Sequence, residues 1–373
     1  MSELEVKTER LVRMLAAENL GGVLLNTQRN FAWLSGGGSN GIDLSGENGA
    51  GFLFVTAKGK RYVIANNIEI GRLLAEEISA EDFEPVEIGW QAEKDPKVAI
   101  DAIKRVTGGD IGSDTGFPET RWIEPSIASC RFELLPSEID RFRDLGRAAG
   151  GALGSVIPRL DIGMTEKQIA RIVRDELARD DIFSVVTLVA ADDRIAKYRH
   201  PIPTDNVWAN TLLVVVCARR QGLVASLSRM ICAGDIPEDL QRRTEACAKV
   251  NAALYAATFV GATSSQLYSA AAAAYAEQDF SDEINKHHQG GACGYRTRDW
   301  VAHPDGGEIV RPHQAFAWNP SITGTKTEET AILGAEGLEI ITGTDGFPVI
   351  SSFADGREYF SPGILSLSKG ASA

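Results

Sequence analysis

Hydrophobic residues change their spacing several times along the first third of the chain. Between Glu5 and Leu20 the leucines recur at near-helical spacing, and Gly21-Gly22 ends this segment before the apolar run 23–25. Further apolar runs and two helical segments follow, at 51–55, 61–65, 68–77, 83–88, 94–106 and 109–113. This alternation of strands and helices predicts a small α/β domain at residues 1–135.

A second domain is predicted for residues 136–365. Ser137 is placed to cap a long helix, and Thr165 with Gln168 three residues later forms the capping-box pattern of the next helix. The further predicted elements are three strands, two helices, a region of short strands and turns, and a disordered tail, at 184–190, 211–218, 222–232, 237–259, 265–278, 287–360 and 366–373. The fold class expected for the whole chain is α/β (α+β).

Composition and charge narrow the functions that this fold can serve. The 373 residues include 38 basic and 51 acidic side chains, a net charge of −13, and no run of Lys or Arg that would follow a phosphate backbone. The longest apolar stretch, Leu212 to Ala218, is far shorter than the roughly 20 residues that span a bilayer. The N-terminus is charged from its third residue and lacks an apolar signal core. We therefore expect a cytoplasmic protein that binds neither nucleic acid nor membrane.

The five cysteines predict neither a disulfide framework nor a zinc cluster. They are odd in number and no two have C-x-x-C spacing, so we expect free thiols. Cys293 lies five residues after His288 and is a candidate nucleophile. The alternative, a small buried cysteine, is the commoner case.

His200 lies beside a turn that is stiffened by Pro201 and Pro203. Such a turn can hold a polar side chain toward a cleft, and a neutral imidazole that titrates near pH 6.5 is the usual proton shuttle. The alternative is a surface histidine in a turn.

The stretch from His287 to Trp300 is the most polar part of the chain and contains three glycines that permit close backbone approach. We expect a ligand-binding loop here. Arg296 and Arg298 can together hold a carboxylate. The alternative is a solvated turn in which Arg298 pairs with an acidic neighbour.

The chain resembles the pita-bread superfamily of prolidases, Xaa-Pro aminopeptidases, methionine aminopeptidases and creatinase. In the first half, Asn30-Phe31-Ala32-Trp33-Leu34-Ser35-Gly36 resembles the family's Asn-x-x-Tyr-Leu-Thr-Gly. In the second half the matching segments keep the family's order: His200-Pro201 with Pro203-Thr204, Gly222 to Arg229, His288-Gln289-Gly290-Gly291, Asn319-Pro320 and Glu328-Glu329-Thr330. The resemblance implies a creatinase-type N-terminal α/β domain followed by a pita-bread catalytic domain.

The resemblance also allows the family's metal ligands to be checked one by one. The family's peptidases hold two metal ions with two Asp, one His and two Glu, and the matching positions here are Val215, Ser226, His288, Asn319 and Glu328. Val215 offers no donor atom, and a close pair of dications requires several anionic oxygens. We therefore expect neither a metal nor another cofactor, and no metal-dependent peptidase activity.

Creatinase, in the same superfamily, works without metal and uses a histidine as acid and base; His200 matches that histidine. Its two substrate-binding glutamates correspond to Ser228 and Asn319, which carry no charge, so a cationic amidine such as creatine fits poorly. Arg296 and Arg298 lie near the place where creatinase supplies an arginine to its substrate's carboxylate. The expected substrate is therefore a small anionic or zwitterionic molecule.

The remaining site residues are assigned on the same resemblance. Neutral donors that can stabilise developing charge are His288, Ser228, Tyr295 and Asn319, and Tyr198 beside His200 is a further candidate for substrate contact. Glu328 can orient an imidazole; the alternative is a buried strand carboxylate paired with Lys326.

The resemblance also implies a homodimer in which an N-terminal loop reaches the neighbouring site. The matching segment is 35–51, with polar residues Asn40, Asp43, Glu47 and Asn48.

Our main hypothesis is a metal-independent hydrolase or lyase, which cleaves a carbon–nitrogen or similar carbon–heteroatom bond of a small carboxylate-bearing metabolite, with His200 as acid and base. Two alternatives remain open. One is a catalytically inactive pita-bread protein that binds a peptide or metabolite. The other is a divergent Xaa-Pro metallopeptidase.

Overall fold

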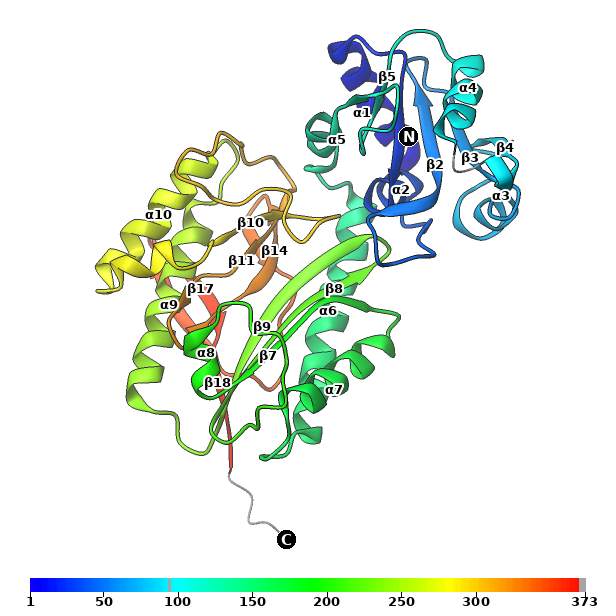
Figure 1. Ribbon diagram of the computed structural model, residues 1–373. Coiled ribbons are helices and arrows are strands. Elements are labelled where there is room, and N and C mark those ends of the chain that lie inside the picture. The colour runs from blue at the N-terminus through cyan, green and yellow to red at the C-terminus, as the bar shows by residue number, and fades with distance from the viewer. Residues whose placement is uncertain (93–94, 369–373) are drawn as a thin grey trace. The chain divides into compact units, whose positions relative to one another are not determined.

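The computed structural model describes residues 1–92 and 95–368. The chain divides into two compact units (Figure 1). Unit 1 contains residues 1–137 and 221–223, and unit 2 contains residues 138–220 and those from 224 onward. Among the described residues, no helix is both long enough and apolar enough to cross a membrane.

Unit 1 is a six-stranded sheet with helices on its faces. Its helices are α1 (Glu3–Glu18), α2 (Gln28–Ser35), α3 (Ile70–Arg72), α4 (Pro96–Val106) and α5 (Glu124–Arg131). Its strands are β1 (Gly22–Thr27), β2 (Asn48–Thr56), β3 (Arg61–Asn66), β4 (Glu84–Ile88), β5 (Ile111–Ser113) and β6 (Arg121–Trp122), in the order β4-β3-β2-β1-β5-β6. Ile100 and Ile103 of α4 pack on Leu24 and Phe54, which places α4 against one face of the sheet (Figure 1).

The loop between α2 and β2 contains the residues expected to reach a neighbouring subunit. Asn40 is buried and donates hydrogen bonds to the carbonyl oxygens of Asn26 and Gly51, whereas Asp43 and Glu47 are exposed. The homodimer itself stays a prediction.

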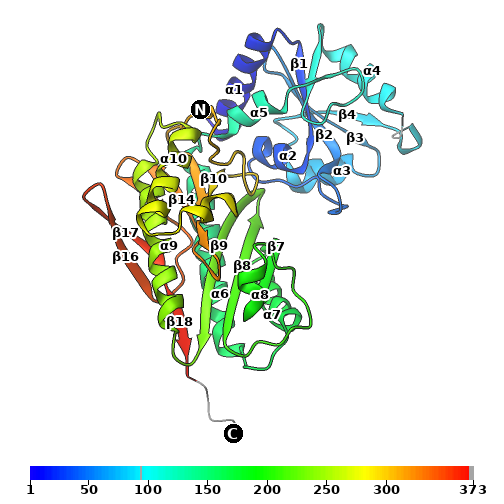
Figure 2. The same cartoon turned by 60° about the vertical axis from the view of Figure 1, so that its left-hand side comes forward.

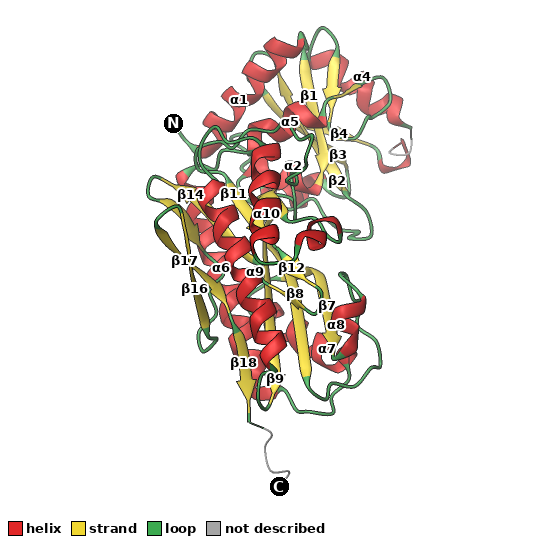
Figure 3. Ribbon diagram, turned by 90° about the vertical axis from the view of Figure 1, so that its left-hand side faces the viewer, coloured by secondary structure: helices red, strands yellow, loops and turns green. Residues whose placement is uncertain are grey.

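Unit 2 contains two four-stranded sheets, two short strand pairs and the long helices (Figures 2 and 3). Its helices are α6 (Pro136–Val156), α7 (Glu166–Ala178), α8 (Asp193–Lys197), α9 (Glu238–Ala257) and α10 (Ser264–Glu277). The first sheet has the order β18-β9-β8-β7, from β7 (Phe183–Ala191), β8 (Thr211–Arg220), β9 (Leu223–Ala233) and β18 (Ile364–Leu367). The second has the order β10-β11-β14-β15, from β10 (Gly290–Cys293), β11 (Ala315–Trp318), β14 (Glu329–Gly334) and β15 (Gly337–Ile340). The short pairs are β12 (Ser321–Ile322) with β13 (Thr325–Lys326), and β16 (Val349–Ala354) with β17 (Arg357–Pro362).

A tight turn fixes the register of β8 and β9. Gln221 and Gly222 both have positive φ, at 50° and 80°, which is the backbone of a two-residue hairpin turn whose twist suits the flanking strands. The two sheets are linked where the Ser228 amide donates to the Glu328 carbonyl, at 3.1 Å. This link brings the start of β14 beside the middle of β9.

The structure also tests three local predictions. The capping box of Thr165 and Gln168 is confirmed at the start of α7, because each side chain bonds the other's backbone amide. The cap expected at Ser137 is wrong: Ser137 lies inside α6, and its hydroxyl donates to Glu3 instead. In the expected tail, residues 366 and 367 pair with β9 in β18, while residues 369–373 lie outside the described residues.

Glu166 at the start of α7 holds the segment that carries His200. Its buried carboxylate accepts hydrogen bonds from the amides of Ala191 and Thr204, from the Thr204 hydroxyl and from the Arg194 guanidinium. The segment between β7 and β8 is thereby tied to α7 on both sides of His200.

Replacing Glu166 tests this anchor. We expect Glu166→Ala to lower the free energy of unfolding by about 3 kcal/mol or more, because it leaves the mostly buried Arg194 without its partner. Urea unfolding measures the loss. Lys197→Ala removes an exposed ion pair with Asp193 and should have little effect on stability, because solvent screens such a pair. Equal losses in the two variants would contradict the anchor.

Candidate functional site

Unit 2 contains a cavity of about 270 Å³ beside the first sheet. Five of the residues that sequence analysis proposed for the site line it: His200, His288, Arg298, Asn319 and Glu328. Further lining residues are Val186, Leu188, Val215, Cys217, Thr297 and Lys326. The cavity therefore joins the His200 turn, the loop after α10 and the ends of β11 and β13.

One wall of the cavity is apolar and comes from two paired strands. In the register of β7 and β8, Leu188 lies opposite Val215 and Val186 lies opposite Cys217. Residues two apart on a strand face the same side, so these four side chains form one surface. Ser226 on β9 is fully buried: its hydroxyl donates to Cys217 Sγ at 3.3 Å, and the side chain does not line the cavity.

A second part of the lining is dominated by Glu328 and two cations. Lys326 Nζ lies 2.8 Å from Glu328 Oε2, and Arg298 Nη2 lies 2.9 Å from Glu328 Oε1. The Ser228 hydroxyl donates to the same carboxylate at 2.6 Å. The carboxylate thus bonds two cations and a hydroxyl, and it orients no imidazole among the described residues. The pairing with Lys326 matches the alternative raised from the sequence.

Glu328, Lys326 and Arg298 form a charge triad, and the two cations control the protonation of the Glu328 carboxylate. Burial alone would raise the pKa of Glu328, but the positive charges of Lys326 and Arg298, with hydrogen bonds from Lys326 and Ser228, lower it to about 2. The carboxylate is therefore ionised at neutral pH. With two cations and one anion, the triad has a net charge of about +1.

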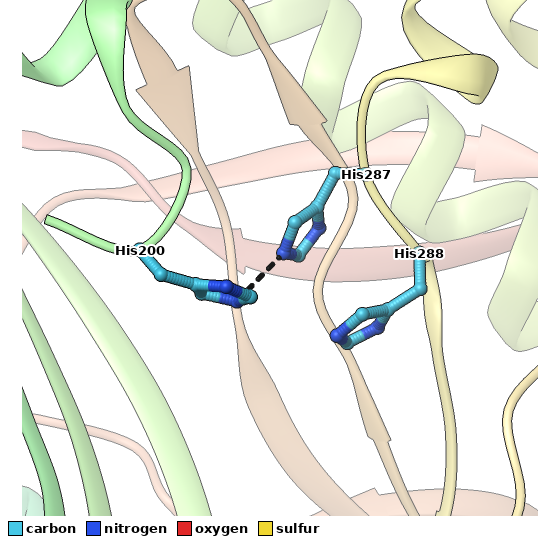
Figure 4. A group of neighbouring side chains, drawn as sticks. All are labelled: His200, His287 and His288. Atoms are coloured by element: carbon cyan, nitrogen blue, oxygen red, sulfur yellow. Dashed lines mark hydrogen bonds between the residues drawn. The ribbon is translucent and has the colours of Figure 1, made fainter.

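Three histidines face one another (Figure 4), and two of them, His200 and His288, line the cavity. His200 Nε2 and His287 Nε2 lie 3.1 Å apart, and the rings of His287 and His288 are stacked with centroids 4.3 Å apart. Burial, followed by the charge of Lys326, lowers the pKa of His200 and lowers that of His287 to about 2. Burial and the charge of Arg298 lower the pKa of His288 to about 4. All three imidazoles are therefore neutral at pH 7.

The backbone after His288 fixes how this ring is presented. The Gly290 amide donates to His288 Nδ1 at 3.2 Å, so the neutral ring carries its proton on Nε2 and acts there as a donor. Gly290 has φ 96°, and a Cβ at that position would lie 2.1 Å from the Ala317 carbonyl oxygen. Glycine is therefore required where β10 leaves the histidines and pairs with β11.

Asn319 follows β11 and has an unsatisfied oxygen. Its side chain lines the cavity and is 3% exposed, and Oδ1 has no hydrogen-bond partner among the described residues. A buried acceptor without a partner costs free energy, so Oδ1 is a candidate to accept a hydrogen bond from a ligand.

Three residues proposed from the sequence, Tyr198, Tyr295 and Arg296, lie away from the cavity. Tyr198 is 52% exposed, and the Arg194 guanidinium packs over its ring at 5.4 Å from the centroid. Tyr295 is buried and its hydroxyl donates to Glu138 at 2.8 Å, while Arg296 is exposed. The expected carboxylate clamp of two arginines therefore reduces to Arg298 alone.

The surroundings of Cys293 do not suit a nucleophile. The side chain is buried in β10, and burial raises the pKa of its thiol to about 12. A thiol in this state is not a nucleophile at neutral pH. The commoner alternative, a buried structural cysteine, describes it.

Two polar residues of the site were missed or undervalued in the sequence. His287 bonds the candidate proton shuttle His200, and its only sequence signal is that it precedes His288. Lys326 appeared there only as a partner of Glu328, yet it lines the cavity with a side chain that is 6% exposed. One ring nitrogen from each of the three histidines lies within 4.8 Å of the other two, which is close enough to share a metal ion. Among the described residues, this is the group of potential metal ligands that meets this condition.

Comparison with solved structures shows how widely this fold occurs. The prolidase from Pyrococcus horikoshii OT3 superposes with a TM-score of 0.75 at 17% identity, over 91% of this chain and 98% of that one. The Xaa-Pro dipeptidase from Bacillus anthracis gives 0.72 at 16% identity, over 90% and 96%. The N-terminal domain of FACT complex subunit SPT16 from Cicer arietinum gives 0.68 at 13% identity, over 91% and 96%. At these identities the likeness is one of fold.

The resemblance to the pita-bread superfamily is confirmed, as is the expected fold class. A comparison with curated protein sequences finds no match. The sequence model of metallopeptidase family M24 matches residues 140–342, more than half of the chain and all of the cavity-lining residues. The protein therefore belongs to metallopeptidase family M24.

Proposed function

We propose that the protein is a hydrolase that cleaves a carbon–nitrogen bond of a small carboxylate-bearing metabolite, and that it does so without the metal pair of its family. The observation that carries the proposal is the bonding of Glu328 to both Lys326 and Arg298. Family membership alone favours a metallopeptidase, whereas the donor set at the expected metal positions supports a site without the metal pair.

That donor set does not fit two metal ions. Of the matching positions, Val215 presents an isopropyl group to the cavity, and Ser226 does not line it. In the described part of the chain, Glu328 is the one carboxylate that lines the cavity, and it already bonds two cations. A pair of dications needs several anionic oxygens and would be repelled by Lys326 and Arg298.

The fixed cations supply the electrostatic stabilisation instead. Lys326 and Arg298 are held by Glu328 and both line the cavity, where the Lys326 ammonium has three donors of which Glu328 takes one. They can bind a substrate carboxylate or the oxygen that becomes negative during hydrolysis. His288 Nε2–H adds a neutral donor at the same cavity.

His200 is the proposed acid and base. As a neutral imidazole it removes a proton from water while the water oxygen attacks the substrate carbon, and it returns that proton to the leaving nitrogen as the carbon–nitrogen bond breaks. His200 lines the cavity and is exposed, so water can reach its ring. The likeness to creatinase, which also uses a histidine at this position, supports this role.

A second candidate is a divergent metallopeptidase with one ion on the three histidines. Family membership and the 4.8 Å cluster support it. Two observations oppose it. The charge of Lys326 acts on the same imidazoles, and His288 Nδ1 accepts a hydrogen bond, whereas a metal-bound imidazole normally donates from its second nitrogen.

Turnover without metal tests the proposal. Protein treated with a chelator and then dialysed is incubated with a panel of small carboxylate-bearing amides, and released amine is measured alongside bound metal. We expect turnover with well under one equivalent of metal. Activity that appears only when Mn²⁺, Co²⁺ or Zn²⁺ is added would support the second candidate, and binding without turnover would support an inactive binding protein.

His200→Ala tests the proton transfer. We expect kcat to fall by about 10²–10⁴ without a change in thermal unfolding. Since burial and Lys326 lower the pKa of His200, the wild-type kcat/KM should rise with pH through a pKa below 6.5 and be level at neutral pH. An unchanged rate in the variant would remove His200 from the mechanism.

Glu328→Gln tests the charge triad. We expect a loss of about 3–5 kcal/mol at pH 7, because Lys326 and Arg298 stay buried without their anion. The folded pKa of about 2 lies below the unfolded value of 4.5, so this stabilisation is present above pH 4.5 and is lost as pH falls toward 2. Urea unfolding across this range should show a flatter acid dependence in the variant; identical curves would contradict the triad.

A further inference from the structure

The cavity combines three kinds of contact that together restrict its ligand. Lys326 and Arg298 line one part of the cavity, Val186, Leu188 and Val215 line an apolar part, and Asn319 Oδ1 is an acceptor without a partner among the described residues. Each contact accepts one chemical group and disfavours another, so the combination can be translated into a substrate class.

The charges disfavour a free amine on the substrate. A protonated amine would meet two cations, while the Glu328 carboxylate is already bonded by Lys326, Arg298 and Ser228. The neighbouring imidazoles are neutral and supply no negative charge. An ammonium group would therefore lose its hydration without gaining a counter-ion.

The acceptor favours an amide that keeps its hydrogen. Asn319 Oδ1 is buried without a partner among the described residues, and a turn of the side chain toward the cavity that it lines would let this oxygen accept an N–H from the ligand. A secondary amide provides this donor, whereas a bond to a proline nitrogen has no N–H and would leave the acceptor unsatisfied.

From these contacts we propose that the substrate is an N-acyl amino acid with a secondary amide, an uncharged acyl group and an apolar side chain. The carboxylate lies on Lys326 and Arg298, the amide N–H on Asn319, and the apolar group against Val215 and Leu188. This inference rests on the proposed function. Water adds across the amide, so that the carbon–nitrogen bond breaks and the products are a carboxylate and a free amino acid.

Three matched ligands test the inference by calorimetry, with no need for turnover. The probes are N-acetyl-leucine, N-acetyl-N-methyl-leucine, which lacks the amide hydrogen, and alanyl-leucine, which adds a free ammonium and one carbon. We expect N-acetyl-leucine to bind the wild-type protein, and each of the other two to bind about 10-fold to 100-fold more weakly.

Two variants test whether Asn319 causes the preference for N-acetyl-leucine over the N-methyl ligand. In Asn319→Ala the N-methyl ligand should bind as well as N-acetyl-leucine, while Asn210→Ala, at an exposed asparagine outside the cavity, should keep the wild-type preference. Thermal unfolding checks that both variants fold. If a variant does not fold, the binding of the three ligands to the wild-type protein still tests the inference.

Failure of N-acetyl-leucine to bind, or equal binding of alanyl-leucine or of the N-methyl ligand to the wild type, would overturn the inference. The proposed function would survive such a result if another carboxylate in the amide panel were hydrolysed without metal. If no amide is hydrolysed but N-acetyl-leucine binds with the expected preferences, the ligand class stands and the hydrolase fails.

Discussion

The structure of the site depends on one buried carboxylate that bonds two side-chain cations. Glu328 is held between Lys326 and Arg298, and each of the three would be costly to bury alone. The arrangement places fixed positive charge at the cavity wall, where peptidases of the pita-bread superfamily hold metal ions. Under the proposed function, this exchange of metal for fixed cations is how a member of metallopeptidase family M24 keeps the fold without most of the family's metal ligands.

The scaffold brings these groups together from distant parts of the chain. The β8–β9 hairpin turn sets which side chains of β8 face the cavity, and the Ser228–Glu328 bridge brings the second sheet to β9. Glu166 ties down the segment of His200, and Gly290 lets β10 approach β11 directly after the histidines. Most of these contacts join residues far apart in sequence, so the cavity exists only once both sheets have formed.

Local patterns and the order of the motifs predict the fold, but they predict the site only in part. The capping box at Thr165 is a local signal and could be predicted, whereas Ser137 has the same chemistry but lies within a helix that begins at Pro136. His200, His288 and Glu328 were found because their motifs keep the family's order. The role of Lys326 depends on the cross-sheet position of Glu328, and the separation of Tyr295 from the cavity depends on its bond to Glu138; neither contact has a sequence signal.

The most direct test of the metal-free site is diffraction from crystals soaked in Mn²⁺ and measured near the manganese absorption edge. We expect no anomalous peak between Val215 and Glu328, with Lys326 and Arg298 still bonded to the carboxylate. Two peaks a few ångströms apart at that place, with the cations displaced, would contradict a site that works on fixed charge alone.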